Sequence, residues 1–293
     1  MCVLTYFFIT TEHLIDGLWF KDEEDFRTGM NYVAVLSYVF GIKVVAFILM
    51  SNHVHFLIVC RNRVEAEAFI NEFKRRYSRY YRIKYGVKEF LRGNGVDIQE
   101  ITAEDEAVER VIAYINVNSV SANICLSPSG YPWGTGDCFF NFNRAKGITL
   151  ERLSGREMIR ILHSGTKLPP EWTLRDGKYI DPASYVDCES VEKIFRTPKR
   201  MNYFLANSSK ARKALANNES ITPKFRDQII VAAIPDLCYS MFRKQSAAEL
   251  DSRQLILFLK QLRARFCADV NQVARVVGLP YEAVAKMLDD ICL

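Results

Sequence analysis

The first half of the chain alternates between strand-like and helix-like patterns of apolar residues. β-Branched and aromatic residues fill Val3–Thr11, which predicts a strand. A rough apolar stripe at helical spacing predicts a helix over Glu23–Gly41. Two further apolar runs flank Ser51-Asn52, and asparagine tolerates a tight turn. Residues 43–59 therefore predict a β-hairpin.

The alternation continues with two more helices and a short strand. Aromatic and apolar residues recur at three- and four-residue steps over Val64–Tyr85, which predicts a helix. Residues 86–99 contain three glycines and predict a loop that ends in a short strand. Ala103–Asn118 predicts another helix, whose acidic start suits the positive end of the helix dipole. This order indicates an α+β fold, a ferredoxin-like antiparallel sheet with helices on one face.

The chain changes character in its second half. A turn-rich tract at 127–137 closes the first domain, and from Thr149 onward strand signals vanish while helical patterns dominate. We therefore predict three parts: a first domain at 1–145, a helical linker or accessory region at 146–225, and a helical domain at 226–293.

The segment 269–288 has apolar residues at the positions of a helix-turn-helix. Gly278 would form the turn, Leu279 would fill the core, and Tyr281–Asp289 would be the second helix. That helix carries Lys286 but also acidic residues, which disfavour entry into a DNA groove. A packing or dimerisation module is therefore an equal alternative to DNA reading.

Composition narrows the class of protein without defining it. The chain has 293 residues, 49% hydrophobic and 25% charged, and can bury an ordinary globular core. Its net charge of +5 permits a polyanionic partner but does not demand one. The eight cysteines are scattered, which suits small core residues in a reducing compartment. With neither a secretory signal nor a membrane-length apolar run, we expect a soluble, cytoplasmic protein without a membrane partner.

Two of the four histidines stand in His53-Val54-His55, directly after the predicted hairpin turn. Because side chains alternate along a strand, both imidazoles lie on one face and can reach one divalent ion. The alternative for so short a spacing is a pair of surface histidines on a half-buried strand. The neighbouring motifs decide between the two interpretations.

Three segments, in order, resemble the single-tyrosine HUH transposases of the REP-associated tyrosine transposase type. AFILMSNHVHFLIV is similar to the family's MPNHVHLL segment, and FKRRYSRYYRIKYG is similar to its basic helix. AYINVNSVSAN is similar to the family's YIELNPVRAG segment. The resemblance covers roughly residues 1–140. The chain departs from the pattern where Ser51 and Ser119 replace two prolines, and where the family's early arginine is absent.

The resemblance implies a role for each site residue. The nucleophilic tyrosine maps to Tyr114, and the third metal ligand maps to Asn118, which joins His53 and His55 around Mg²⁺ or Mn²⁺. In this family the tyrosine attacks a phosphodiester of single-stranded DNA at hairpin-containing sites. It leaves a 5′-phosphotyrosine and a 3′-OH that are later rejoined. Helical spacing agrees, because residues four apart share a face, and Arg110 on the same stripe could meet a phosphate.

Cations and tyrosines crowd the segment 73–86, which makes it the chain's clearest candidate for binding DNA. The cations predicted to bind DNA here are Lys74, Arg75, Arg76, Arg79 and Arg82. Cations bind phosphates, and tyrosines can stack on unpaired bases, so the segment predicts contacts with single-stranded or hairpin DNA. The alternative is a solvated helix face with its tyrosines in the core.

Three functions are compatible with these motifs. The first is a nucleoid-associated DNA strand transferase, monomeric or homodimeric as members of the family are. The second is a DNA-binding regulator with a catalytically inactive, domesticated transposase domain. The third is a metal phosphoesterase built on the two histidines. Only the first forms a covalent adduct with DNA.

Overall fold

The computed structural model describes residues 4–145, 147–208, 225–266 and 268–289. The chain divides into two compact units. Unit 1 comprises Met1–Glu12, Glu24–Met50 and Val54–Ser220. Unit 2 comprises His13–Glu23, Ser51–His53 and Ile221–Leu293. The predicted three-part division stays a prediction, and its boundaries fall beside residues 146 and 209–224, which lie outside the described ranges.

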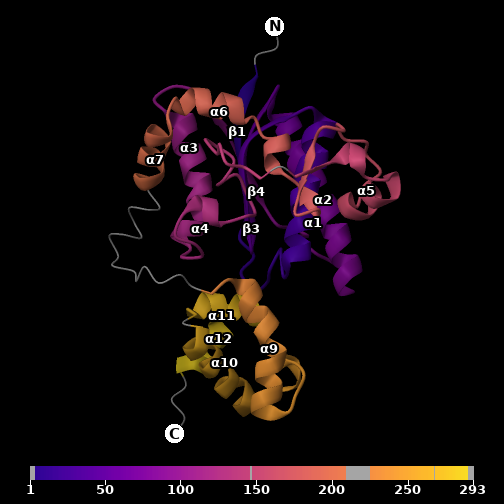
Figure 1. Ribbon diagram of the computed structural model, residues 1–293. Coiled ribbons are helices and arrows are strands. Elements are labelled where there is room, and N and C mark those ends of the chain that lie inside the picture. Colours follow the sequence, from indigo (N-terminus) through magenta and orange to yellow (C-terminus); the bar gives the residue numbers. More distant parts are fainter. Residues whose placement is uncertain (1–3, 146, 209–224, 267, 290–293) are drawn as a thin grey trace. The chain divides into compact units, whose positions relative to one another are not determined.

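A four-stranded sheet forms the centre of unit 1, with the strand order β2-β3-β1-β4 (Figure 1). Its strands are β1 (Thr5–Thr11), β2 (Lys43–Met50), β3 (His53–Cys60) and β4 (Val96–Ile101). β1 pairs antiparallel with both β3 and β4. This order is that of the ferredoxin-like fold, so the predicted fold class is confirmed.

Helices cover both faces of this sheet. They are α1 (Glu23–Phe40), α2 (Arg63–Tyr85), α3 (Ala107–Asn116) and α4 (Asn118–Ser121). From β3, Phe56 packs edge-on against Phe69 and Phe73 of α2, at centroid distances of 5.4 and 5.5 Å. The adjacent His55 contacts Tyr114 of α3. Successive strand residues point to opposite faces, so α2 and α3 lie on opposite sides.

The predicted arrangement of helices on one face therefore holds for α1 and α2, which contact each other through Phe40 and Phe69. α3 adds a layer on the other face, as Figure 1 shows.

The outer edge of β2 is also covered. Leu49 N donates to Trp133 O, and Asp187 N donates to Val44 O. These bonds use backbone groups that an open edge strand would leave unpaired.

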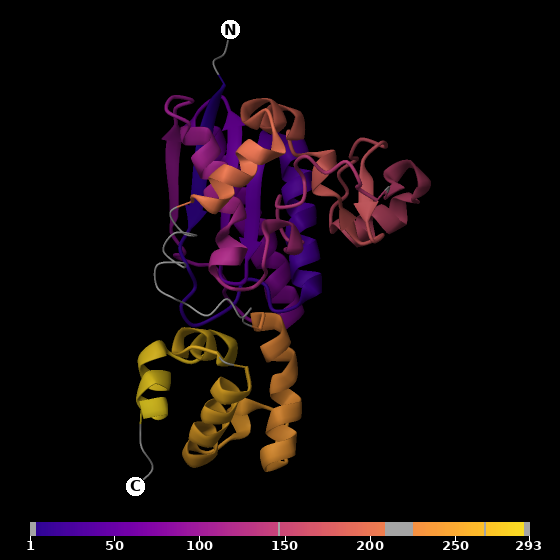
Figure 2. The ribbon, with the colours of Figure 1, turned by 60° about the vertical axis from the view of Figure 1, so that its left-hand side comes forward.

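Residues 147–185 contain a second, three-stranded sheet, ordered β5-β6-β7. The elements are β5 (Ile148–Thr149), α5 (Gly155–Leu162), β6 (Thr173–Arg175) and β7 (Tyr179–Ile180). Leu174 and Ile180 of this sheet share a buried cluster with Ala34 and Val35 of α1. Residues 147–185 accordingly lie beside α1 in Figure 2. The expectation that no strands follow Thr149 is wrong, because strands of two or three residues are too short to show an alternation of apolar and polar residues.

Two short helices complete the described part of unit 1. They are α6 (Cys188–Phe195) and α7 (Pro198–Ala206). Asp187 and Thr197 cap their N-termini, and Pro198 occupies a first-turn position that needs no N–H donor.

Four helices of unit 2 pack around a common apolar core. They are α9 (Asp227–Phe242), α10 (Ser252–Phe266), α11 (Val270–Val277) and α12 (Tyr281–Asp289). Phe258, Leu262 and Val273 are fully buried in this core. Gly278 ends α11 in the left-handed conformation with φ 75°, so the predicted turn and second helix are confirmed. Whether these helices read DNA stays a prediction.

Candidate functional site

The hydrogen bonds around His53 define which ring nitrogen can accept a ligand. Asn52 Nδ2 donates to Leu14 O at 3.1 Å, which turns Asn52 Oδ1 toward His53 Nδ1 at 2.9 Å. An amide oxygen only accepts, so His53 Nδ1 carries the proton and Nε2 keeps its lone pair. The ring is 5% exposed and stacks on His13 at a centroid distance of 3.6 Å. Its orientation is therefore fixed before any ligand binds.

His55 is held in a similar way from the neighbouring strand. Thr10 lies opposite His55 in the register of β1 and β3, and its Oγ1 lies 3.0 Å from His55 Nδ1. Phe8 stacks on the ring at a centroid distance of 5.8 Å. Because Nδ1 is engaged by the hydroxyl, Nε2 is the nitrogen suited to a metal ion.

Tyr114 lies in α3 and contacts the His55 side of the sheet. Its ring meets the imidazole of His55 edge-on, with centroids 5.6 Å apart and an interplanar angle of 77°. It meets Phe8 in a similar edge contact at 5.8 Å. Burial raises the pKa of the half-buried phenol above its ordinary value. The hydroxyl is therefore protonated at neutral pH and must release its proton to act as a nucleophile.

Asn118 lies beside Tyr114 in space, although one continuous helix does not join them. α3 ends at Asn116, and Asn118 begins the single turn of α4. The Asn118 Nδ2 donates to the carbonyls of Tyr114 and Ile115, at 2.8 and 3.2 Å. The predicted helix over Ala103–Asn118 is therefore broken at Val117. Since the amide nitrogen serves the end of α3, Oδ1 is the atom of Asn118 suited to a cation.

This chemistry is compatible with a divalent metal ion. Two imidazoles with hydrogen-bonded Nδ1 atoms and one amide oxygen form a mixed nitrogen and oxygen donor set. Within the described ranges, no three His, Cys, Asp or Glu side chains gather into a metal site.

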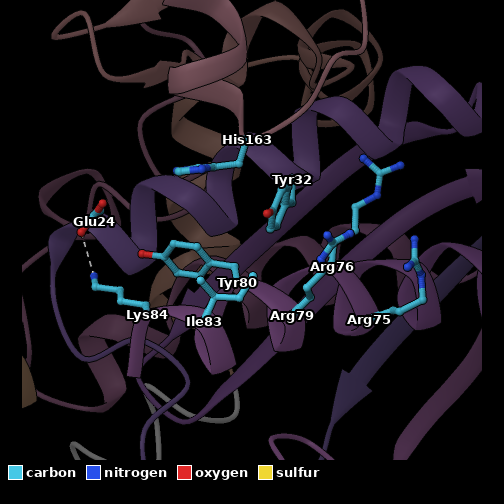
Figure 3. A pocket seen from close by; sticks show the side chains of 9 residues that line it. All are labelled: Glu24, Tyr32, Arg75, Arg76, Arg79, Tyr80, Ile83, Lys84 and His163. Atoms are coloured by element: carbon cyan, nitrogen blue, oxygen red, sulfur yellow. Dashed lines mark ion pairs between the residues drawn. The ribbon is translucent and has the colours of Figure 1, made fainter. Parts of the chain in front are cut away.

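A cavity of about 610 Å³ lies along α2 on the other face of the sheet (Figure 3). Arg75, Arg76 and Arg79 line one end, and Lys84 pairs with Glu24 at the other end. Glu72 binds Arg75 and Arg76, at 2.6 and 2.7 Å, and these bonds lower the pKa of Glu72 to about 2. Arg79 is exposed, and none of the ion pairs found in the described ranges involves it.

The two remaining predicted DNA-binding cations of α2 form hydrogen bonds within the protein. Lys74 donates to the carbonyl of Asn94, and Arg82 Nη1 donates to Lys88 O at 3.3 Å. The structure therefore brings together three of the five predicted DNA-binding cations of this helix.

The tyrosines of α2 are used within the fold. Tyr77 and Tyr81 are buried, at 0% and 5% exposure. Tyr80 and Tyr85 donate to the fully buried Asp25, at 3.0 and 2.7 Å. Tyr77 and Tyr81 are therefore core residues, as the alternative has it, while Tyr80 also lines the cavity of Figure 3.

Arg110 lies one turn before Tyr114, and both line a second cavity of about 370 Å³. The wall opposite α3 is α7, which contributes Tyr203 and Phe204. Sequence reasoning predicted the shared face of Arg110 and Tyr114 but did not find Tyr203. It also did not find Thr10 or Asn52, since hydrogen bonds between neighbouring strands and loops leave no periodic signal in a sequence.

A comparison with protein families agrees with the motifs. Residues 20–118 match the model of the family described as "Transposase IS200 like". This span holds His53, His55, Tyr114 and Asn118. The match confirms the resemblance of this region to the transposase family.

One solved structure and the curated proteins complete these comparisons. A "REP associates tyrosine transposase bound to a REP hairpin" is 14% identical with a TM-score of 0.35, over 58% of this chain and 86% of that one. No curated protein matches the sequence. In the part of the chain that the structure describes, no helix is both long and apolar enough to cross a bilayer.

Proposed function

We propose that this protein is a metal-dependent transposase that cleaves and rejoins single-stranded DNA through a 5′-phosphotyrosine on Tyr114. The observation that carries the proposal is the edge contact between Tyr114 and His55, within the region that matches the transposase family. Of the 14 tyrosines, Tyr114 combines this contact with an asparagine amide at the end of its own helix.

The side chains of the site divide the chemistry between them. His53, His55 and Asn118 would hold Mg²⁺ or Mn²⁺, which when bound polarises the phosphate and stabilises the leaving oxygen. The phenolic oxygen of Tyr114 forms a bond to phosphorus and loses its proton to solvent or a nearby base. The bond to the 3′ oxygen breaks, and that oxygen gains a proton. A second 3′-OH reverses the step, so the phosphotyrosine conserves the energy of the broken link.

We propose that DNA contacts involve the cations that line the two cavities. Arg75, Arg76 and Arg79 present guanidinium groups along one cavity, and guanidinium suits bidentate binding of phosphate. Arg110 presents another beside the nucleophile. We propose hairpin-containing single strands as the substrate.

A covalent adduct is the decisive test. Labelled single-stranded hairpin oligonucleotides are incubated with the protein and Mg²⁺ or Mn²⁺, then resolved under denaturing conditions. Wild type and the Tyr38→Phe control, an exposed tyrosine on α1, should form the adduct, and Tyr114→Phe should not. Absence of an adduct from wild type contradicts the proposal. Binding without cleavage supports the inactive regulator, and cleavage without an adduct supports the phosphoesterase.

A further inference from the structure

The cavity beside Tyr114 has one wall that comes from outside the region matching the transposase family. α3 supplies Arg110 and Tyr114, and α7 supplies Tyr203 and Phe204. The match ends at residue 118, so α7 is an addition with respect to the matched region. The cavity has a volume of about 370 Å³, at the small end of the range for ligand pockets, about 300–1,000 Å³. It suits one nucleotide and not a duplex.

Ion pairs and aromatic contacts fasten α7 to α3. Arg200 of α7 pairs with Glu106 at 2.9 Å and with Glu109 at 3.1 Å. The same guanidinium lies over the ring of Phe204 at 5.2 Å. Phe204 is buried and packs edge-on against Phe195 of α6, with centroids 5.7 Å apart. The wall is therefore held without help from Tyr203.

Tyr203 remains 63% exposed at this cavity. Its ring meets Phe204 edge-on at 5.7 Å, so the adjacent ring restrains its position. A restrained, exposed aromatic ring can stack on an unpaired base with little loss of side-chain entropy. The charges suit a nucleotide too. Arg200 forms the short ion pairs with the carboxylates of Glu106 and Glu109. Arg110 forms a longer ion pair with Glu106, at 3.8 Å, and 64% of its side chain is exposed.

We propose that this cavity is a nucleotide-binding subsite for the single-stranded DNA next to the cleaved bond. Tyr203 stacks on the base, and Arg110 binds the flanking phosphate. This inference rests on the proposed function for its position relative to the cut, and it gives the region 146–225 a role in holding substrate.

Binding can be measured separately from chemistry. The full-length Tyr114→Phe variant serves as the background, so no cleavage alters the strand. Fluorescence anisotropy compares two labelled probes of equal length, oligothymidylate and a strand of abasic residues. Their affinity ratio isolates the contribution of the bases from that of the phosphates.

Tyr203→Ala should weaken oligothymidylate binding on the order of tenfold and leave abasic binding nearly unchanged. Tyr203→Phe should retain the preference for bases, because it keeps the aromatic face. The matched control is Tyr239→Ala on α9, which removes a tyrosine of 56% exposure from unit 2 and should change neither affinity. Arg110→Ala should weaken both probes together, since both carry phosphates.

An unchanged affinity ratio in Tyr203→Ala overturns the subsite. The subsite is also overturned if Tyr203→Ala lowers the oligomer mass in light scattering and leaves base binding unchanged. Tyr203 would then contact a second copy of the chain. The outcome is separable from that of the proposed function. A wild type that forms no adduct but shows base binding dependent on Tyr203 retains the subsite and refutes only the chemistry.

Discussion

The ring of Tyr114 lies edge-on to the imidazole of His55, with their centroids 5.6 Å apart. The contact joins α3 to the face of β3 opposite the one that packs on α2. It places a protonated phenol beside a histidine whose Nδ1 lies 3.0 Å from Thr10 Oγ1. The candidate nucleophile and the strand that carries the two histidines therefore meet through side-chain packing.

Asn52→Ala should weaken metal binding without unfolding the protein. Asn52 Oδ1 accepts the proton of His53 Nδ1 and so keeps Nε2 available to a cation. Loss of such a partner typically costs about 10- to 100-fold in metal affinity. Titration with Mn²⁺, followed by the electron paramagnetic resonance of the free ion, measures the change. The control Asn141→Ala removes an exposed asparagine elsewhere, and equal affinity in both variants would contradict the assigned tautomer.

Arg79→Ala should lower DNA affinity and flatten its dependence on salt. The Arg79 side chain enters the cavity of Figure 3, and a phosphate contact made there releases counterions. Removing one such contact should reduce the slope of log affinity against log salt by about 1. Arg156→Ala, an exposed arginine of α5, should leave the slope unchanged. If both variants keep the wild-type slope, DNA does not bind along this face of α2.

Much of the fold follows from local patterns, and the exceptions have physical causes. Alternation and helical spacing predicted the main sheet and the long helices, because each element is long enough to show its period. Tyr281–Asp289 was predicted to the residue, since Gly278 ends the preceding helix. β6 and β7 were missed because strands of two or three residues are too short to show a periodic pattern of apolar residues. The break at Val117, next to which the Asn118 amide donates to the Tyr114 carbonyl, was not predicted.

The candidate site divides in the same way. His53, His55, Tyr114 and Asn118 could be found in the sequence because motifs carry them. Tyr203 could not, because a tertiary contact between α3 and α7 brings it to the cavity. No local sequence pattern specifies that contact.

Glu72→Gln should destabilise the protein at neutral pH, and the difference from wild type should shrink in acid. The two arginines lower the pKa of Glu72 to about 2 in the folded state, from an ordinary 4.5. The ionised form is therefore favoured by folding, and its stabilisation is present above pH 4.5 and lost as pH falls toward 2. Urea unfolding of both proteins between neutral and acidic pH measures the difference. A constant difference across that range would mean that the carboxylate charge is not the cause.

Ser51→Ala should destabilise the helices of unit 2. Ser51 stands where the related family has proline, and its hydroxyl donates to the buried Asp227 Oδ2 at 2.6 Å. Arg275 binds both oxygens of that carboxylate, at 2.9 and 3.2 Å, and Gln272 donates to Oδ1. Asp227 thus ties the turn before His53 to α9 and α11.

A hydrogen bond to a charged group contributes about 1.5–3 kcal/mol, so Ser51→Ala should lower the unfolding free energy of unit 2 by an amount of this order. The control Ser240→Ala removes a hydroxyl that donates to a helix carbonyl of α9, and it should cost less. Hydrogen exchange of α9 and α11 locates the effect. Faster exchange in Ser51→Ala, confined to these helices, together with weaker Mn²⁺ binding, would show that the serine connects the turn before His53 to α9 and α11. Equal exchange in both variants would leave the replacement of proline without a structural role.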